Sequence, residues 1–144
     1  IANMGKRAAR GYDLNDTPED QAYGGATAET VQTNNAVSET DRIVIIYDGK
    51  IIPAYYSASA GGQTNTAAQV WTKDLAYLKS VPSFDDGIRK KGHGVGMSQF
   101  GAGFMATDLK MPFDKILKHY YTGITLATKP EIISKYRENH LKKK

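Results

Sequence analysis

The chain has 144 residues and a formal net charge of +4, with 40% hydrophobic and 24% charged residues. This length is enough for one domain with a real core. Cysteine is absent, which excludes disulfides, thiolate metal sites and a cysteine nucleophile. No apolar run approaches the roughly 18 residues of a membrane-spanning helix. The positive charge favours a polyanionic partner, namely nucleic acid, an anionic lipid surface or an anionic cell-wall polymer. No nucleic-acid fingerprint occurs, so we expect no nucleic-acid partner.

The N-terminal quarter predicts short helices and ordered loops. The chain begins with Ile1 rather than Met, so we interpret it as an internal piece or a processed form of a longer protein. Residues 1–10 are basic and contain alanine, which predicts the end of a helix that Gly11 terminates. Residues 12–26 are rich in Asp, Asn, Pro and Gly, as is typical of turns. Residues 30–41 predict a short surface helix.

The clearest strand signal covers residues 42–58. Two β-branched runs, 42–47 and 50–56, flank Asp48-Gly49, and this pattern predicts a hairpin with a type I′ turn. Pro53 in the second run predicts an edge strand or a bulge.

The second half predicts loops followed by two helices. Residues 68–78 form an apolar patch with the only tryptophan, Trp71. Ser98 is the natural N-cap of a helix that runs to about Leu109, and Pro112 opens a second helix that ends before Gly123. Residues 124–126 predict a last strand. The expected fold is α+β: a single domain over residues 1–126 with an antiparallel, hairpin-based sheet, a few packed helices and long ordered loops, followed by a basic tail over 127–144.

The best site candidate is the glycine-rich stretch 92–102, which contains four glycines, His93 and Gln99. Such a run is typical of positive-φ turns or of a backbone that closely approaches a ligand or another strand. Its position before a helix N-terminus also offers free N–H groups.

Three other kinds of site are weighed against it. A catalytic triad needs Ser57 or Ser59 with His93 and Asp85 or Asp86, but neither serine lies in a G-x-S-x-G elbow. The histidines have no i, i+4 pairing, so we expect no metal site, and His119 at a helix end predicts a capping or packed residue. The carboxylates lie in polar loops, where the raised pKa of a general acid is not expected.

Sugar-binding chemistry is better represented, because aromatic rings with polar rims accompany many hydroxyl and amide side chains. We expect most of these rings to be core residues and the remainder to face a ligand. The aromatic residues concerned are Tyr23, Tyr55, Tyr56, Trp71, Tyr77, Tyr120 and Tyr121.

Four motifs together resemble the SpoIID/LytB family, which includes stage II sporulation protein D and amidase enhancers. They are the block AYYSASAGGQT at 54–64, Val70-Trp71 with YLKSV at 77–81, GHGVGMSQFGA at 92–102 and ILKHYYTG at 116–123. The resemblance runs from about Gly11 to Leu126 with order and spacing kept.

The resemblance implies a peptidoglycan lytic transglycosylase that acts on peptide-free glycan strands during sporulation engulfment. In that chemistry one glutamate acts as acid and then base, and the muramic 6-hydroxyl attacks C1 to leave a 1,6-anhydro end. It also implies an amidase/endopeptidase partner of the sporulation protein P type and an extracytoplasmic location, with a membrane anchor outside this chain. The alternative within the family is a non-catalytic wall-binding module that enhances an amidase.

The chain departs from the family in three places. The catalytic glutamate precedes a helix motif that is expected upstream of Ile1, so no catalytic residue is assigned in this chain. Residues 16–21 have no Cys or His where some members hold zinc, so neither a metal nor another cofactor is expected. Members also have a longer segment before the glycine-rich turn. The residues expected to contact glycan are Tyr56, Ser57, Ser59, Gly62, Trp71, His93, Gly94 and Gln99.

Overall fold

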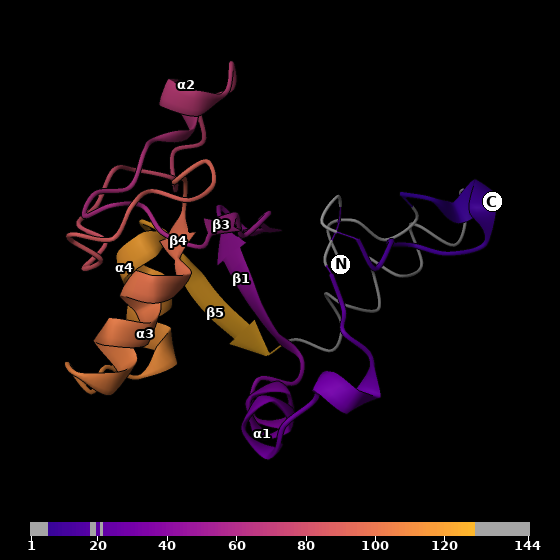
Figure 1. Ribbon diagram of the computed structural model, residues 1–144. Coiled ribbons are helices and arrows are strands. Elements are labelled where there is room, and N and C mark those ends of the chain that lie inside the picture. Colours follow the sequence, from indigo (N-terminus) through magenta and orange to yellow (C-terminus); the bar gives the residue numbers. More distant parts are fainter. Residues whose placement is uncertain (1–5, 18–19, 21, 129–144) are drawn as a thin grey trace. The chain divides into compact units, whose positions relative to one another are not determined.

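The computed structural model describes residues 6–17, 20 and 22–128 (Figure 1). The chain divides into two units, Ile1–Val44 with Ala127–Lys144, and Ile45–Leu126. Helices accompany two small sheets, which confirms the predicted α+β class. Most of the predicted basic tail lies outside the described residues, and the boundary at residue 126 stays a prediction. In the part of the chain that is described, no helix has both the length and the apolar character to cross a membrane.

The first unit contains short helices that lack a buried face. The 3-10 turn η1 (Ala8–Arg10) ends at Gly11, whose φ of 82° and N–H bond to the Ala8 carbonyl confirm the predicted stop. A second 3-10 turn, η2 (Ala26–Ala28), precedes α1 (Val31–Glu39). Thr30 caps α1 by accepting from the Thr33 N–H at 3.1 Å. No residue of α1 is buried, as predicted for a surface helix.

The predicted hairpin is confirmed. Strand β1 (Ile43–Tyr47) pairs antiparallel with β2 (Lys50–Ile51), with Tyr47 opposite Lys50. Asp48 and Gly49 have φ values of 49° and 70°, and positive φ at both central positions is what a type I′ turn requires. The sheet order is β2-β1-β5, with β5 at Thr125–Thr128, so the predicted last strand is present as well.

The second strand is shorter than predicted, and the residues after it join a different sheet. After Ile52 donates to the Ile45 carbonyl at 3.1 Å, Pro53 has no N–H to continue the ladder. The chain then forms β3 (Tyr56–Ser57), which pairs in parallel with β4 (Met97–Ser98). Residues 50–56 do contain strand residues, as predicted, but Lys50–Ile51 belongs to one sheet and Tyr56 belongs to the other.

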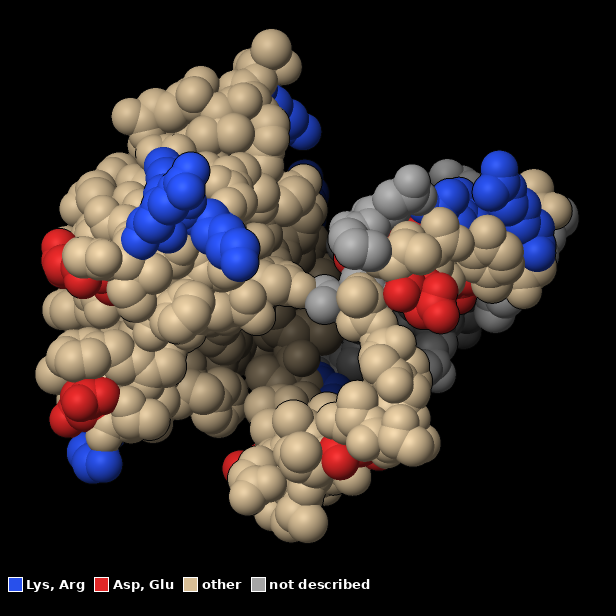
Figure 2. All heavy atoms as spheres, viewed as in Figure 1, with Lys and Arg blue, Asp and Glu red and all other residues tan. Residues whose placement is uncertain are grey.

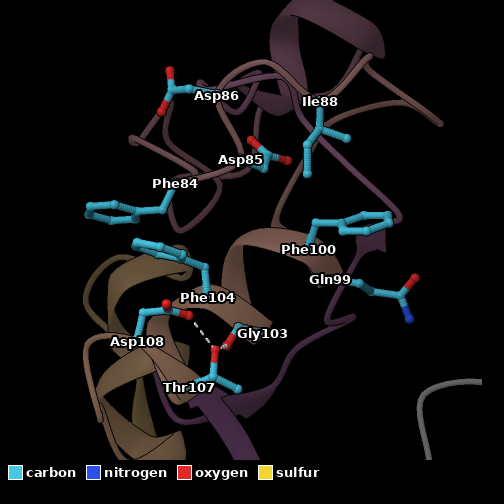
Figure 3. Close-up of a pocket in the computed structure, with 10 residues that line it drawn as sticks. All are labelled: Phe84, Asp85, Asp86, Ile88, Gln99, Phe100, Gly103, Phe104, Thr107 and Asp108. Carbon is cyan, nitrogen blue, oxygen red and sulfur yellow. Dashed lines mark hydrogen bonds between the residues drawn. The ribbon is translucent and has the colours of Figure 1, made fainter.

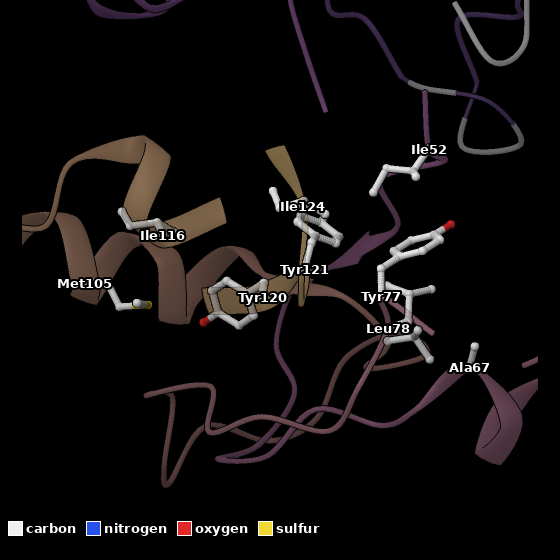
Figure 4. Close-up of a cluster of buried hydrophobic side chains, with 10 residues drawn as sticks. Ile52, Ala67, Tyr77, Leu78, Met105, Ile116, Tyr120, Tyr121 and Ile124 are labelled. Carbon is white, nitrogen blue, oxygen red and sulfur yellow. The ribbon is translucent and has the colours of Figure 1, made fainter. Parts of the chain in front are cut away.

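The second unit packs its helices α2 (Ala67–Val70), α3 (Gln99–Thr107) and α4 (Phe113–Tyr120) around one apolar cluster (Figure 4). Ser98 caps α3 by accepting from the Gly101 N–H at 3.1 Å, and Pro112 is the N-cap of α4, as predicted. Only three of the seven aromatic residues that were expected to be mostly core are buried. The buried members of the cluster are Ile52, Ala67, Tyr77, Leu78, Val95, Met105, Ile116, Tyr120, Tyr121 and Ile124.

Gly101 allows α3 to lie directly against the loop that precedes it. A Cβ at this position would lie 1.6 Å from the Ser83 carbonyl oxygen and 2.3 Å from the Tyr120 hydroxyl. The Tyr120 hydroxyl itself donates to the Ser83 carbonyl at 2.8 Å. This contact fixes the start of α3, and with it the glycine-rich turn, against the rest of the unit.

Candidate functional site

The glycine-rich turn, residues 92–96, packs against the segment that follows the hairpin. Gly92, Gly94 and Gly96 have φ values of 99°, 68° and 75°, which favour glycine. A Cβ at Gly96 would lie 2.0 Å from the Tyr55 carbonyl oxygen, and one at Gly92 would lie 2.9 Å from Ser57 Cβ. The glycines are therefore needed for both of the predicted reasons: they adopt positive φ, and they allow another part of the chain to approach closely.

These loops are joined by short bridges rather than by long strands. Figure 1 shows that the chain between β3 and β4 is mostly loop, with α2 as its only helix. Ser59 bridges to Lys91, and the Asn65 N–H donates to the Gly94 carbonyl at 2.7 Å. The Asn65 amide Nδ2 donates to the His93 carbonyl at 3.0 Å. The loop around residues 57–65 thus holds the backbone of the turn.

The buried carboxylate of Asp85 accepts hydrogen bonds from several of these loops. Asp85 is 3% exposed and accepts from the N–H groups of Ala60 and Gly62, each at 2.7 Å. It also accepts from the Ser98 hydroxyl at 2.7 Å and from the Ser83 hydroxyl. Burial alone would raise the pKa of Asp85, but these four hydrogen bonds outweigh it and hold the pKa well below its usual range. The side chain is therefore an ionised clamp between loops.

Three aromatic rings meet beside the turn, and we call Tyr55, Trp71 and His93 the aromatic corner. The Trp71 ring centre lies 4.7 Å from that of Tyr55 and 5.1 Å from that of His93. Tyr55 and His93 meet edge to face at 6.4 Å. Tyr55 is 37% exposed, and Trp71 and His93 are half-buried, so the corner presents ring surface to solvent.

The surroundings of His93 favour its neutral form. Its Nδ1 accepts from the Val95 N–H at 3.0 Å, so the ring proton is on Nε2 in the neutral tautomer. Burial and the positive charge of Lys90 lower the pKa of His93, against an opposing hydrogen bond with the Tyr56 backbone. A neutral imidazole beside two aromatic rings is suited to contact a ligand through its face or its N–H.

The predicted contact residues do not all lie together. Trp71 and His93 share the aromatic corner, and Gly94 is the buried residue that follows His93 in the turn. Tyr56 is 39% exposed and follows Tyr55 in the chain. Gln99 is exposed at the start of α3 and lines a separate groove.

The other three predicted contact residues, Ser57, Ser59 and Gly62, are buried or half-buried in the segment that packs against the turn. Ser59 is 1% exposed, and its hydroxyl donates to the Arg89 carbonyl at 2.6 Å. Gly62 donates to Asp85 and has a φ of 93°. Ser57 is 7% exposed, and its Oγ has no hydrogen-bond partner in the part of the chain that is described. Ser59 and Gly62 therefore have clear structural roles, and a glycan-contacting role for all three stays a prediction.

The structure does not assemble the serine triad. His93 Nδ1 is occupied by the Val95 N–H, and Ser57 Oγ makes no hydrogen bond with it. Asp85 bonds to serine hydroxyls and backbone N–H groups instead of to the imidazole. The arrangement therefore lacks the linked nucleophile, base and orienting acid of such a site.

An open groove of about 930 Å³ lies between the 84–88 loop and α3 (Figure 3). Figure 3 shows the rings of Phe84 and Phe104 facing each other and Phe100 beside Ile88; the Phe84 and Phe104 planes differ by 14° at 6.4 Å. Asp86 and Asp108 lie among the lining residues. The sequence reasoning missed this groove, although Phe100 and Phe104 recur at helical spacing.

His119 and the acidic residues form no metal centre in the described ranges. His119 Nε2 donates to the Pro82 carbonyl at 2.6 Å, and the ring packs against Phe84 and Tyr120. This confirms the predicted packed histidine. No group of three or more His, Asp or Glu side chains with metal-binding proximity occurs within residues 6–17, 20 and 22–128.

The chain is an α+β protein. Its two small sheets and short helices support a surface that is built from loops at the glycine-rich turn. No protein-family model matches it. Stage II sporulation protein D of Bacillus amyloliquefaciens is 25% identical over 227 aligned positions, which cover 94% of this chain and 66% of that protein. The amidase enhancer of Bacillus subtilis (strain 168) is 38% identical over 78 residues, 49% of this chain and 11% of that protein. Stage II sporulation protein D of Bacillus subtilis (strain 168) is 38% identical over 63 residues, 44% of this chain and 18% of that protein.

These relatives confirm the resemblance to the SpoIID family that the motifs carry. The chain spans about two thirds or less of the length of these relatives. The 227 aligned positions exceed the 144 residues of the chain, so the Bacillus amyloliquefaciens protein has additional residues inside the matched region. The expected longer segment before the glycine-rich turn stays a prediction.

Proposed function

We propose that this chain binds peptidoglycan glycan strands and forms the glycan-positioning part of a SpoIID-type lytic transglycosylase that acts in sporulation. The observation that carries the proposal is the aromatic corner, because Tyr55, Trp71 and His93 present ring faces and polar edges beside the turn. Amphipathic rings are suited to a ligand whose faces are apolar and whose edges carry hydroxyls. The names of the relatives support a sporulation role.

The proposed reaction is non-hydrolytic cleavage of peptide-free strands during engulfment. One glutamic acid first donates its proton to the leaving glycosidic oxygen as the C1–O bond breaks. The resulting carboxylate then takes the proton of the muramic 6-hydroxyl, whose oxygen forms the new bond to C1. One carboxyl group suffices because the nucleophile belongs to the substrate. We place this glutamate N-terminal to Ile1, and we propose an amidase/endopeptidase partner of the sporulation protein P type and an extracytoplasmic, membrane-associated full-length protein.

The state of Asp85 supports an acid supplied from outside these loops. Asp85 is bonded to Ser98 at the start of α3, but its hydrogen bonds lower its pKa. A general acid needs a raised pKa so that it is protonated near neutral pH. Asp85 therefore supports a structural role, and the same observation favours a second candidate, a wall-binding module without its own chemistry, as the name of the amidase enhancer suggests for that relative.

Peptide-free glycan strands distinguish the two candidates. The chain and a longer version with its natural upstream sequence are each incubated with the strands, binding is measured by titration calorimetry, and the products are weighed by mass spectrometry. We expect both proteins to bind and only the longer protein to produce 1,6-anhydromuramic ends. Binding without cleavage by the longer protein supports the wall-binding module, and reducing ends would identify a hydrolase. Turnover by the 144-residue chain alone would show that the glutamate has been misplaced.

A further inference from the structure

Lys90 lies across the glycine-rich turn beside the aromatic corner. A Cβ built on Gly94 would lie 2.4 Å from Lys90 Cε and 2.9 Å from Lys90 Nζ. The same point lies 3.5 Å from the Asn65 amide Nδ2. The absent side chain of Gly94 therefore leaves room for the Lys90 stem, and its ammonium group is placed close to His93 and Asn65.

The Lys90 ammonium has no carboxylate partner in the described part of the chain. The ion pairs found there join other residues, among them Lys118 with Asp114 and Arg7 with Asp20. Lys90 belongs to the run Arg89-Lys90-Lys91, and Figure 2 shows basic side chains gathered over the loops above α3. An unpaired cation of this kind attracts an anionic ligand.

The glycan substrate carries one anionic group of the right kind. Each muramic acid bears a lactyl ether whose carboxyl group is amide-bonded to the stem peptide in intact peptidoglycan. Removal of the peptide frees that carboxylate, so a peptide-free strand has one negative charge on every second sugar. An aromatic surface with one lysine beside it matches a sugar ring with one carboxylate.

We infer that the Lys90 ammonium binds the free lactyl carboxylate of a muramic acid whose ring contacts the aromatic corner, and that Lys90 thereby selects strands from which the peptide has been removed. This inference rests on the proposed function. It adds a specificity residue that the motif residues alone do not identify, and it gives Gly94 a specific task, which is to let the lysine stem lie flat across the turn. A lysine is suited to this task because its flexible stem lets the three N–H donors of the ammonium group adjust to the position of a carboxylate.

The test compares two forms of the same peptide-free strands. One form keeps its lactyl carboxylates, and in the other they are converted to neutral amides. Titration calorimetry with the full chain measures both affinities at low ionic strength. We expect the carboxylate form to bind about three- to tenfold more tightly, the range for a hydrogen-bonded, partly exposed ion pair, and added salt to remove most of the difference.

Three variants assign the preference to Lys90. Lys90→Met keeps most of the stem and should bind both forms equally, whereas Lys90→Arg should keep most of the preference. Lys115→Met on α4 removes the same net charge elsewhere and should leave the preference intact. Thermal melting of each variant verifies the fold, which the exposed Lys90 side chain should hardly affect.

Two results would overturn the inference and leave the proposed function standing. They are equal binding of the two strand forms by the unmodified chain, and a preference that survives in Lys90→Met. Failure of the chain to bind either form would overturn the proposed function together with the inference.

Discussion

Replacing the Asp85 carboxylate with a neutral amide should destabilise the loops that support the turn. Each carboxylate oxygen accepts one backbone N–H and one serine hydroxyl. In Asp85→Asn the amide nitrogen must replace one oxygen, so a buried N–H of Ala60 or Gly62 loses its acceptor. A buried unsatisfied donor costs about 1–3 kcal/mol, and the remaining bonds lose their charge-assisted strength. We expect the free energy of unfolding to fall by about 3 kcal/mol.

The assay is urea unfolding followed by circular dichroism, with Asp86→Asn as the matched control. Asp86 is exposed, so its change should be within about 0.5 kcal/mol. Because hydrogen bonds lower the folded-state pKa of Asp85, its stabilisation is present above the unfolded-state pKa of about 4 and is lost as pH falls toward the folded-state value. The difference between the native chain and Asp85→Asn should therefore be largest near neutral pH and shrink below about pH 4. A difference under about 1 kcal/mol, or one that grows on acidification, would refute the clamp.

Three further predictions concern the turn and its helix. Gly101→Ala should lower the free energy of unfolding by about 3 kcal/mol or more, because its Cβ would overlap a carbonyl oxygen. Gly103→Ala in the same helix meets nothing within 4 Å and should stabilise by about 0.5–1 kcal/mol through helix propensity; equal effects in urea unfolding would contradict this contrast. Ser98→Ala removes both the N-cap and a bond to the clamp and should cost about 2 kcal/mol in the same assay, whereas a loss below 0.5 would show that neither bond matters. Since the Lys90 charge contributes to the lowered pKa of His93, Lys90→Met should raise that pKa in an NMR titration, and an unchanged or lower value would contradict the proximity of the two groups.

Local sequence signals predicted the elements that local physics determines. Asp48-Gly49 fixes the hairpin because both residues adopt positive φ, and Ser98 fixes the start of α3 through one side-chain acceptor. Each signal acts within about four residues. The glycine content of residues 92–102 also predicted positive-φ turns and the close approach of another part of the chain, and the structure contains both.

The remaining features depend on contacts that no short window contains. The Asp85 clamp joins residues 2 to 25 positions away, and nothing in the run SFDDG distinguishes Asp85 from Asp86. The second strand ends early because Tyr56 pairs with Met97, 41 positions away, rather than with β1. No local pattern around residues 50–56 contains that pairing. Gln99 was grouped with His93 because they are close in sequence, but the helix start places it on a separate groove.

The most direct test of the account is the affinity of peptide-free glycan strands for the chain with and without the aromatic corner. Trp71→Ala removes the central ring, and Phe113→Ala on α4 removes an exposed ring of another surface. Titration calorimetry should show binding by the native chain and little change of affinity in Phe113→Ala. In Trp71→Ala the affinity should fall about tenfold or more, which corresponds to a ring contact of about 1.4 kcal/mol or more. Equal affinities for the native chain and a folded Trp71→Ala variant, or no binding by the native chain, would contradict a glycan site at the glycine-rich turn.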